Sequence, residues 1–384
     1  MSLEKVVFCD YYIIIMYDTV RVLSESCNVY EEDYNMIVIG EKINGSIPSV
    51  AEAIAKRDAE LIKQRAIAQA EAGATFIDCC ASVPEAEEVE TLKWMIDCIE
   101  EVTDLPIAVD SPSPAVLAEV FSYCKRPGLI NSVSMEGDKC DIIFPKIADT
   151  EWEVAALLCD DTGIPKCAAD RLKVFDNLMA KAKSYGIAPS RIHIDPLIEM
   201  LCTSEDGIAM NEEVISSVRK QYPDIHITAA VSNISFNLPV RKLVNQGFTI
   251  LAMLCGLDSA IFDPLNKDLM GLIQATEALL SKGVTADMDL SEIEAMVDEK
   301  NKKYVLPAYA VLAIKTGAIE LEPDEYDEYD LEGLLEELMA KGNNEYGERD
   351  MLGLLYATIA LNGDDDFCMN YISAYRDGEI GPVK

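Results

Sequence analysis

The sequence predicts a (β/α)8 barrel, an α/β fold in which eight parallel strands close into a ring inside helices, followed by an acidic, mainly helical region. Between residue 36 and about residue 283, short apolar segments alternate with amphipathic helical patterns. The repeat number and length are those of such a barrel. No Gly-x-Gly-x-x-Gly motif follows the first apolar segment, and this disfavours the main alternative, an open doubly wound sheet.

Residues 1–35 do not share this pattern and are predicted to be an appendage without catalytic residues. Their apolar run at 11–17 lies between Asp10 and Asp18 and is far shorter than the roughly 20 residues that span a membrane. The basic segment that begins a signal peptide is missing. Met36 immediately precedes the first predicted strand, so we expect the barrel to begin there.

The predicted barrel, residues 36–283, contains eight apolar strands. They are expected at 37–40, 75–80, 106–110, 129–134, 154–159, 192–197, 225–232 and 259–263. Helices are expected at 49–72, 84–102, 168–185, 211–221 and 267–281. Gly73, Gly186 and Gly283 follow three of these helices, as is typical of C-terminal caps.

Residues 284–384 carry 24 acidic and 8 basic side chains, a net charge of −16. Helices are expected at 291–316, 331–338 and 350–361, with a dense acidic segment at 320–330. A charge run of this kind is usually a solvated surface. Apolar surface for a small helical domain comes from Leu334, Leu335, Leu338, Leu352, Leu354 and Leu355. Such a domain would bury this surface against the barrel or against a partner.

The composition also limits the classes of partner and cofactor. The chain has 32 Lys and Arg against 68 Asp and Glu, a net charge of −36, so nucleic acid and membrane surfaces are not expected partners. Twelve cysteines are scattered without a Cys-x-x-Cys pair, which is typical of a reduced, cytoplasmic protein. With only two histidines, His193 and His226, no His-rich site and no bound metal is predicted.

Polar residues follow every predicted strand, at the end where a barrel carries its active site. We call this end the mouth. In chain order the residues are Glu41, Asn44, Asp78, Asp110, Asn131, Asp160, Asp161, Asp195, Ser232, Asn233 and Asp263. None of these strand ends offers a nucleophile in an activating setting. Carboxylates and amides suit a flat, nitrogen-rich heterocycle that presents N–H donors and a carbonyl acceptor.

Other interpretations of these carboxylates stay open at this point. An aspartate after a strand often caps the next helix, so a structural role for Asp110 or Asp263 is equally consistent with the pattern. Paired acids in a barrel are also typical of glycosidases, although such sites usually carry aromatic platforms and Trp94 lies within a predicted helix. A Mg²⁺ site would need a phosphate or enolate to act on, and Arg241 is the main candidate cation near the mouth.

Several short motifs occur in a fixed order along the predicted barrel. They are GEKIN at 40–44, Asp78, INS at 130–132, IDPL at 194–197, VSNISF at 231–236 and GLDSAIFDP at 256–264. As an ordered set they resemble the pterin-binding methyltransferases that pass a methyl group between tetrahydrofolate and a corrinoid protein. The resemblance covers about residues 36–283. Dihydropteroate synthases share the barrel and the pterin pocket, but their late lysine and Ser-x-Arg motif are missing here.

The resemblance implies roles for individual residues. The pterin contacts of the family fall on Asp78, Asn131 and Asp195, and the amide that approaches N5 falls on Asn233, the expected catalytic residue. Arg241 matches a position near the folate. The other residues expected at the mouth are Glu41, Asn44, Ser232 and Ser235, with Asp110 and Asp160 assigned by position alone.

The reaction implied by the resemblance is a direct displacement without an enzyme nucleophile. Cobalt(I) takes the methyl group from methyltetrahydrofolate, or N5 of tetrahydrofolate takes it from methyl-cobalt(III). The chain lacks an Asp-x-His-x-x-Gly corrinoid-binding signature, so we expect the corrinoid (cobalamin) to be carried by a partner protein. The family also implies a homodimer. Two alternatives remain, namely a folate-binding regulatory protein without transferase activity and a different barrel enzyme, either dihydropteroate-synthase-like or a hydrolase with paired carboxylates.

Overall fold

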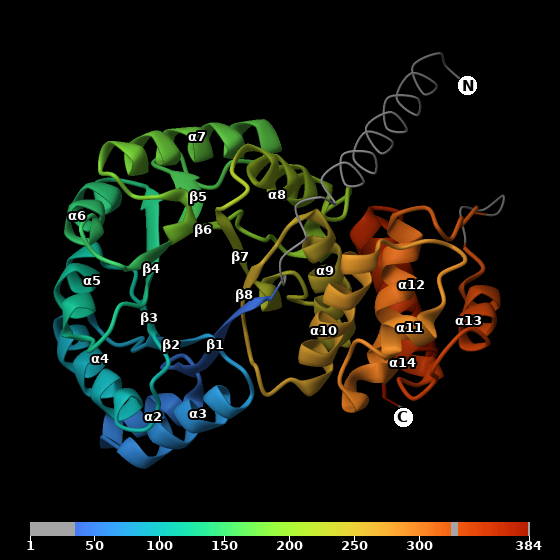
Figure 1. Ribbon diagram of the computed structural model, residues 1–384, viewed down its shortest axis with the longest axis horizontal. Helices are drawn as coiled ribbons and strands as arrows, with labels where there is room; N and C mark the ends of the chain where they lie inside the picture. Colours follow the sequence, from blue (N-terminus) through green and yellow to red (C-terminus); the bar gives the residue numbers. More distant parts are fainter. Residues whose placement is uncertain (1–34, 324–328, 383–384) are drawn as a thin grey trace.

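The computed structural model describes residues 35–323 and 329–382. Eight parallel strands close into a barrel in chain order, and the last strand pairs with the first. Helices surround the strands (Figure 1). The predicted (β/α)8 barrel is therefore confirmed. The predicted appendage lies outside the described residues, except for residue 35.

The strands begin and end close to the predicted positions. They are β1 (Ile37–Asn44), β2 (Phe76–Cys80), β3 (Ile107–Asp110), β4 (Leu129–Met135), β5 (Glu153–Asp160), β6 (Ile192–Asp195), β7 (His226–Ala230) and β8 (Ser259–Phe262). β1 is longer than predicted, so Glu41 and Asn44 belong to the strand itself. β7 is shorter, because Val231–Asn233 leaves the sheet and forms the 3-10 turn η5.

The helices around the barrel differ more from the prediction. They are α2 (Pro48–Lys56), α3 (Ala59–Glu71), α4 (Glu85–Glu100), α5 (Pro114–Val120), α6 (Lys139–Ile147), α7 (Ala168–Ser184), α8 (Ala209–Gln221), α9 (Arg241–Cys255) and α10 (Lys267–Lys282). The single helix predicted at 49–72 is wrong. Arg57 adopts a left-handed conformation (φ 54°) that ends α2, and the Asp58 side chain caps α3 by accepting the Leu61 N–H.

Apolar side chains on the two faces of the strands form two layers. The inner layer lies near the amino-terminal ends of the strands and contains Ile39, Phe76, Ala108, Leu129 and Ala155. Alternate residues, such as Ile77 and Val109, belong to the larger core that contains the buried faces of the helices, as the two-residue period of a strand requires. Because the barrel interior is filled in this way, a ligand site is expected at its mouth.

The C-terminal extension, residues 284–384, is helical as predicted. Its helices are α11 (Leu290–Glu294), α12 (Val305–Lys315), α13 (Leu331–Met339), α14 (Glu348–Asn362) and α15 (Met369–Asp377). The continuous helix predicted at 291–316 is wrong, because the 3-10 turn η6 (Glu299–Tyr304) separates α11 from α12. Figure 1 shows the extension, in orange and red, against α9 and α10 on one side of the barrel.

Both apolar and polar contacts join the extension to the barrel. Of the six leucines predicted to supply apolar surface, five are buried in the same core as the barrel helices. Tyr346 Oη donates to Gln246 Oε1 of α9 (2.7 Å). Lys315 Nζ of α12 pairs with Glu212 Oε2 of α8 (2.7 Å). The extension therefore packs on the barrel, which is one of the two interpretations that the sequence left open.

Two further sequence-based expectations concern membranes and thiols. Among the described helices, none is both long enough and apolar enough to cross a membrane. The ten cysteines in the described ranges are all free thiols, and seven of them are buried. Burial of small thiols is what the scattered cysteine pattern predicts.

Candidate active site

The mouth of the barrel carries a carboxylate–amide pair on β2 and β4, the strands on either side of β3. Asp78 of β2 is 2% exposed, and Asn131 Nδ2 of β4 donates a hydrogen bond to its Oδ1 (3.2 Å). Burial, followed by the charge of the nearby Asp110 carboxylate, raises the pKa of Asp78 well above its ordinary value, and the Asn131 hydrogen bond only partly offsets this. Asp78 is therefore an acceptor whose charge the protein itself stabilises poorly.

Asp110 of β3 lies between these two strands. The strand register pairs it with Cys80 on one side and Asn131 on the other. Burial raises the pKa of Asp110 to about 6, although a hydrogen bond with the Cys80 thiol favours the charged form. Burial also raises the pKa of the Cys80 thiol, so this group is a neutral donor and not a thiolate nucleophile.

Glu41 approaches the same cluster from β1. Burial raises its pKa, and the Asp263 carboxylate adds to the effect while Lys42 and Arg241 oppose it. Lys42 Nζ is itself paired with Asp263 Oδ2 (3.0 Å), and Asp263 Oδ1 accepts the Leu265 N–H (3.0 Å). Asp263 therefore anchors its own loop, and Lys42 is neutralised by it.

Asp195 stands at the end of β6, which is on the other side of the barrel from β2. Its side chain is 8% exposed, and its Oδ1 accepts the Leu197 N–H (2.8 Å). Burial raises the pKa of Asp195 to about 6, while the Leu197 hydrogen bond and the Arg171 charge act in the opposite direction. Like Asp78, this carboxylate has acceptor capacity that the protein does not fill.

Arg171 of α7 positions the loop that follows Asp195, and sequence reasoning missed it. The side chain is fully buried. Its guanidinium donates to the carbonyl oxygens of Pro196 and Leu197, and Nη2 donates to Glu199 Oε2 (2.7 Å). In the sequence, an arginine near the start of a helix looks the same whether it is exposed or buried, so no local signal marks this one.

The turn after β7 carries Asn233, and Arg241 fixes it from α9. Arg241 Nη2 donates to the Ser232 carbonyl (2.7 Å), and Nε donates to Ser235 Oγ (3.0 Å). The guanidinium also lies over the Phe236 ring, 4.7 Å from its centroid. Within residues 35–323 and 329–382 the Asn233 side-chain amide has no hydrogen-bond partner, so both its donor and its acceptor are available to a ligand.

Two of the predicted site residues bind turn residues that follow their own strand or the neighbouring one. Asn44 Oδ1 accepts the Ser46 N–H (2.9 Å) and Ser82 Oγ (3.2 Å). Asp160 Oδ1 accepts both the N–H and the hydroxyl of Thr162 (2.9 and 2.6 Å), and these bonds hold its pKa below the ordinary value. Both side chains stabilise the turns that follow their strands.

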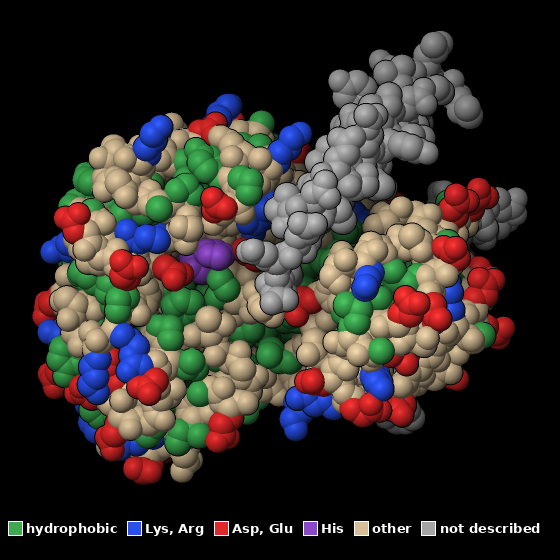
Figure 2. All heavy atoms as spheres, in the orientation of Figure 1, with side chains coloured by type: hydrophobic (Ala, Val, Ile, Leu, Met, Phe, Trp, Pro, Cys, Tyr) green, Lys and Arg blue, Asp and Glu red, His purple; other side chains and the backbone are tan. Residues whose placement is uncertain are grey.

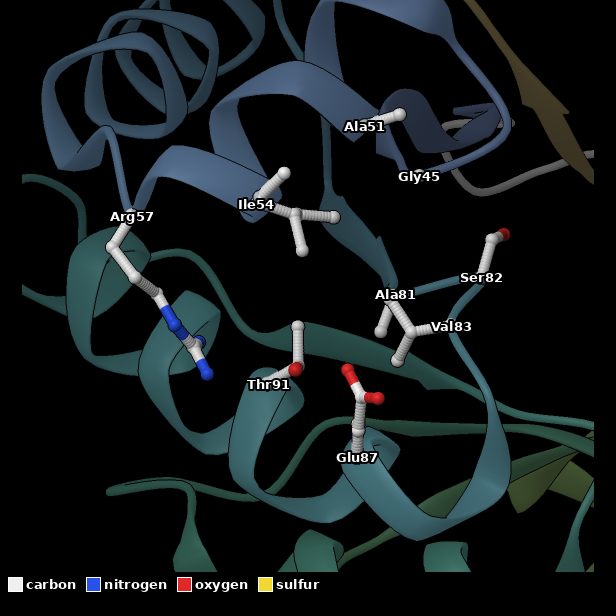
Figure 3. Close-up of a pocket in the computed structure, with 10 residues that line it drawn as sticks. Gly45, Ala51, Ile54, Arg57, Ala81, Ser82, Val83, Glu87 and Thr91 are labelled. Carbon is white, nitrogen blue, oxygen red and sulfur yellow. The ribbon is translucent and has the colours of Figure 1, made fainter.

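A cavity of about 280 Å³ lies beside the mouth, between α2 and α4. Figure 3 shows Ile54, Arg57, Glu87 and Thr91 around it, with Ala81 to Val83 on its other side. Arg57 is paired with Glu90 (3.5 Å) and lies over the Trp94 ring. The cavity is therefore outside the carboxylate cluster, and its cation already has partners.

The chemistry available at the mouth follows from these contacts. Asp78 and Asp195 are buried acceptors and Asp110 is a half-buried one, all with raised pKa values. Among the described residues, the Asn233 amide has no partner. No group of three or more His, Cys, Asp or Glu side chains suited to a metal ion occurs within the described part of the chain. The arrangement suits a neutral ligand that donates several N–H bonds at one end and reacts near an amide at the other.

Comparison with known proteins finds relatives for the barrel region of the chain. Residues 40–263 match the pterin binding enzyme family. A methylcorrinoid:tetrahydrofolate methyltransferase of Eubacterium limosum is 49% identical over 247 residues, which cover 64% of this chain and 91% of that protein. Methionine synthase of Mycobacterium tuberculosis is 30% identical over 246 residues, or 60% of this chain and 21% of that protein.

Solved structures of dihydropteroate synthases also match. The enzyme from Xanthomonas albilineans in complex with 7,8-dihydropteroate is 19% identical, with a TM-score of 0.46 over 64% of this chain and 94% of that one. The enzyme from Coxiella burnetii in complex with pteroic acid is 17% identical, with a TM-score of 0.48 over the same shares of the two chains.

Proposed function

Because the chain belongs to the pterin binding enzyme family, we propose that it transfers a methyl group between N5 of tetrahydrofolate and the cobalt of a corrinoid protein. The protein from Eubacterium limosum named for this reaction is 49% identical to the chain, and its name makes the methylcorrinoid the donor. The structural observation that carries the proposal is the Asn233 amide, which has no partner among the described residues, in a mouth that also holds the buried acceptors Asp78 and Asp195.

Asp78, Asn131 and Asp195 are the proposed contacts of the pterin ring. A pterin presents a ring N–H and an exocyclic amino group as donors, and its carbonyl oxygen is an acceptor. The buried carboxylates of Asp78 and Asp195 accept such N–H bonds, while the Asn131 amide can both donate and accept. Bonds of this kind to a charged carboxylate are worth roughly 1.5–3 kcal/mol each, so they supply affinity as well as orientation.

Asn233 is the proposed catalytic residue. When methyl-cobalt(III) is the donor, the N5 lone pair forms the new N–C bond, the Co–C bond breaks, and its electron pair stays on the cobalt as cobalt(I). N5 is then positively charged and loses its proton. The Asn233 amide can accept a hydrogen bond from N5–H or donate one to its lone pair. It lowers the barrier to the extent that this bond is stronger in the transition state.

The other residues of the mouth are proposed to line the site. Arg241 holds the Asn233 turn through Ser232 and Ser235, and it is proposed to lie near the folate. The half-buried carboxylates of Glu41 and Asp110 add acceptor charge beside Asp78. The hydrogen bonds of Asn44 and Asp160 support a role in holding the surrounding loops.

The partner would dock on exposed apolar side chains around the mouth. These stand on loops after β5 to β8 and on the extension, and we call them the apolar rim: Ile164, Met200, Phe236, Leu265, Phe367 and Met369. Contacts join several of these loops, since Asn237 Nδ2 lies 3.6 Å from Met200 Sδ and the Phe367 N–H donates to the Ser204 carbonyl (3.3 Å). A corrinoid protein must cover this rim to bring its cobalt to the nitrogen that Asn233 contacts.

Variants of the rim test this docking separately from catalysis. Leu265→Asp and Met369→Asp should slow methyl transfer with a corrinoid protein but leave the rate with free cobalamin unchanged. Met296→Asp is the control, because Met296 is equally exposed but lies on the connection after α11, away from the rim. Equal losses with both methyl donors would contradict docking at the rim.

The reaction itself is tested by calorimetric titration with tetrahydrofolate and methyltetrahydrofolate, followed by mixing with reduced free cobalamin. The expected result is binding of both folates and conversion of the cobalt(I) spectrum to that of methyl-cobalt(III). Binding without conversion, with free cobalamin and with a corrinoid protein, would favour the alternative of a regulatory folate-binding protein. Absence of binding would overturn the assignment of the pterin site. A homodimer, a cytoplasmic location and the absence of a resident metal stay predictions, and sedimentation analysis tests the first.

A further inference from the structure

We propose that Tyr371, in the C-terminal extension, is a positioning residue for the Asn233 turn of the active site. This inference rests on the proposed function, because it assigns part of the extension to the same site. Tyr371 lies on α15, more than one hundred residues after that turn, and its side chain is fully buried. Its hydroxyl donates to the carbonyl oxygens of Pro239 (3.2 Å) and Val240 (3.1 Å).

Val240 is the residue on which these contacts act. It caps the amino-terminal end of α9 in a left-handed conformation, with φ 44° and ψ 45°. A β-branched residue is a true outlier there, and such a conformation persists only when its surroundings enforce it. The Tyr371 hydroxyl holds the Val240 carbonyl, and the backbone of Gly381 lies so close that a Cβ there would be 2.9 Å from Val240 Cγ2. Both enforcing contacts come from the extension.

Arg241 connects Val240 to the turn that contains Asn233. It is the first residue of α9, so the conformation of Val240 sets where its side chain begins. Its guanidinium binds Ser232 and Ser235, the residues that flank Asn233 and Ile234. A continuous series of contacts therefore runs from the Tyr371 hydroxyl through Val240 and Arg241 to the turn that carries Asn233.

The extension also holds Tyr371 and the neighbouring loop in place. The Asp365 carboxylate, which is 5% exposed, accepts the N–H groups of Asn370 (2.8 Å) and Tyr371 (3.0 Å). Arg349 binds the carbonyl oxygens of Gly378, Ile380 and Gly381. Farther along the mouth, the Ile208 N–H of the loop after Asp195 donates to the Leu361 carbonyl (2.9 Å). The extension thus braces both loops that carry predicted substrate contacts on this side of the barrel.

The test is Tyr371→Phe, with Tyr309→Phe as a matched control. Tyr309 of α12 is also fully buried, and its hydroxyl also donates to two consecutive carbonyls, those of Thr285 (3.2 Å) and Ala286 (3.3 Å). Those carbonyls lie in the connection after α10, far along the chain from the mouth loops. The Tyr309 hydroxyl also accepts a bond from Lys341 Nζ (3.0 Å), so Tyr309→Phe removes at least as many hydrogen bonds as Tyr371→Phe. The bonds of Tyr371 alone reach the residues that precede Arg241.

We expect Tyr371→Phe to lower the methyl-transfer rate about tenfold, the value of one well-placed hydrogen bond, while folate affinity changes less than the rate does. Tyr309→Phe should leave the rate unchanged within about twofold, although its loss of thermal stability should equal or exceed that of Tyr371→Phe. Val240→Gly in the Tyr371→Phe protein should recover most of the lost rate, because glycine adopts the left-handed conformation without strain. Equal rates for the two tyrosine variants, or no recovery with Val240→Gly, would overturn the proposal.

A second measurement does not depend on the proposed reaction. Amide hydrogen exchange of residues 231–243 should be faster in Tyr371→Phe than in the wild type and unchanged in Tyr309→Phe. If the wild-type protein transfers no methyl group but exchange responds in this way, the proposed function fails and the positioning contact stands. If the wild type transfers methyl and exchange does not respond, the positioning role fails and the function stands.

Discussion

Asp258 at one end of the barrel and three aspartates at the other end differ in how far protein partners compensate their charge. At the amino-terminal end, which we call the floor, Asp258 contacts Arg219 Nη2 (3.0 Å), His226 Nδ1 (2.9 Å) and the Ile227 N–H (2.7 Å). Burial alone would raise its pKa, but these partners hold the pKa of Asp258 below the ordinary value. At the mouth, burial raises the pKa of Asp78, Asp110 and Asp195, since protein partners compensate them only in part.

Polar groups inside the floor are paired as well. His193 is fully buried, with Nε2 2.7 Å from Glu153 Oε2 and Nδ1 3.1 Å from Ser259 Oγ. Burial lowers the pKa of His193, which keeps it neutral at physiological pH. Both histidines lie at the floor. Figure 2 shows this end of the barrel, with histidine in purple and acidic side chains in red beside it. At the floor, the contacts of Asp258 and His193 stabilise the fold. At the mouth, carboxylates with incomplete compensation lower the stability but can accept bonds from a ligand, and barrels bind their ligands at this end.

The largest expected effect belongs to Asn233, whose side-chain amide has no partner in the part of the chain that the structure describes. Asn233→Ala should lower the rate of methyl transfer by roughly 10- to 1000-fold, because one positioned hydrogen bond to the reacting nitrogen is lost. Folate affinity should change much less, and single-turnover rates with separate calorimetry distinguish the two. Asn233→Asp keeps an oxygen acceptor and loses the N–H donor, so it shows which half of the amide acts. Equal losses in affinity and rate would make Asn233 a binding residue only.

The next largest effect tests the floor. Asp258→Asn removes the charge that compensates Arg219, and we expect the free energy of unfolding to fall by about 2–4 kcal/mol, close to what breaking a buried pair costs. Urea denaturation measures it. Folate affinity at the far end of the barrel should stay within about twofold, since well-separated sites act independently. A large loss of affinity would show that the two ends are coupled, and the comparison would fail.

The matching change at the mouth should have the opposite effect on stability. Asp195→Asn should weaken folate binding about 10- to 100-fold, because a charged acceptor is lost. It should also raise the free energy of unfolding by about 1–3 kcal/mol at pH 7, since a buried carboxylate with a pKa near 6 is replaced by a neutral amide. The Asn oxygen can still accept the Leu197 N–H. Unchanged affinity would refute the assignment of Asp195 to the pterin site.

These contrasts also show what could be predicted from the sequence. The strands and the polar residues at their ends follow from local patterns, because period-two apolar segments and the parallel barrel together bring strand ends to one mouth. The Asp78–Asn131 hydrogen bond is consistent with that inference. The break at Arg57 and Asp58 was missed because helical periodicity continues across it, and α5 is too short to show a pattern.

Contacts between distant segments could not be predicted in the same way. Arg171 reaches a loop beyond the next strand, and Tyr371 reaches Val240 from 131 residues away. Nothing near either residue in the sequence identifies its partner, because the partners are backbone carbonyls, which every residue has. The left-handed conformation of Val240 is equally invisible, since valine is among the residues least suited to it.

The smallest expected effect is a pH dependence, which should be opposite in direction for folate affinity and for the stability of the ligand-free protein. Because the free carboxyl groups of Asp110 and Asp195 have pKa values of about 6 and the ligand requires the charged form, folate affinity should weaken about fivefold per group between pH 6 and pH 5. Calorimetry in buffers of different ionisation heat should detect the protons released on binding. Asp195→Asn should remove the contribution of Asp195 to the loss of affinity at low pH and to the proton release on binding.

The stability of the ligand-free protein should respond in the opposite direction. A carboxyl group whose pKa is raised by folding binds protons more tightly in the folded state, so stability increases as the pH falls from 7 toward the unfolded-state value near 4. Glu277, which accepts the Met36 N–H and whose burial raises its pKa to about 7, shares this effect but not the effect on affinity. Acidification from pH 7 to pH 5 should therefore raise the melting temperature of the ligand-free protein. Over the same pH range, the increase in melting temperature on adding folate should become smaller. If the melting temperature of the ligand-free protein and its increase on adding folate change in the same direction, the raised pKa values do not belong to the ligand site.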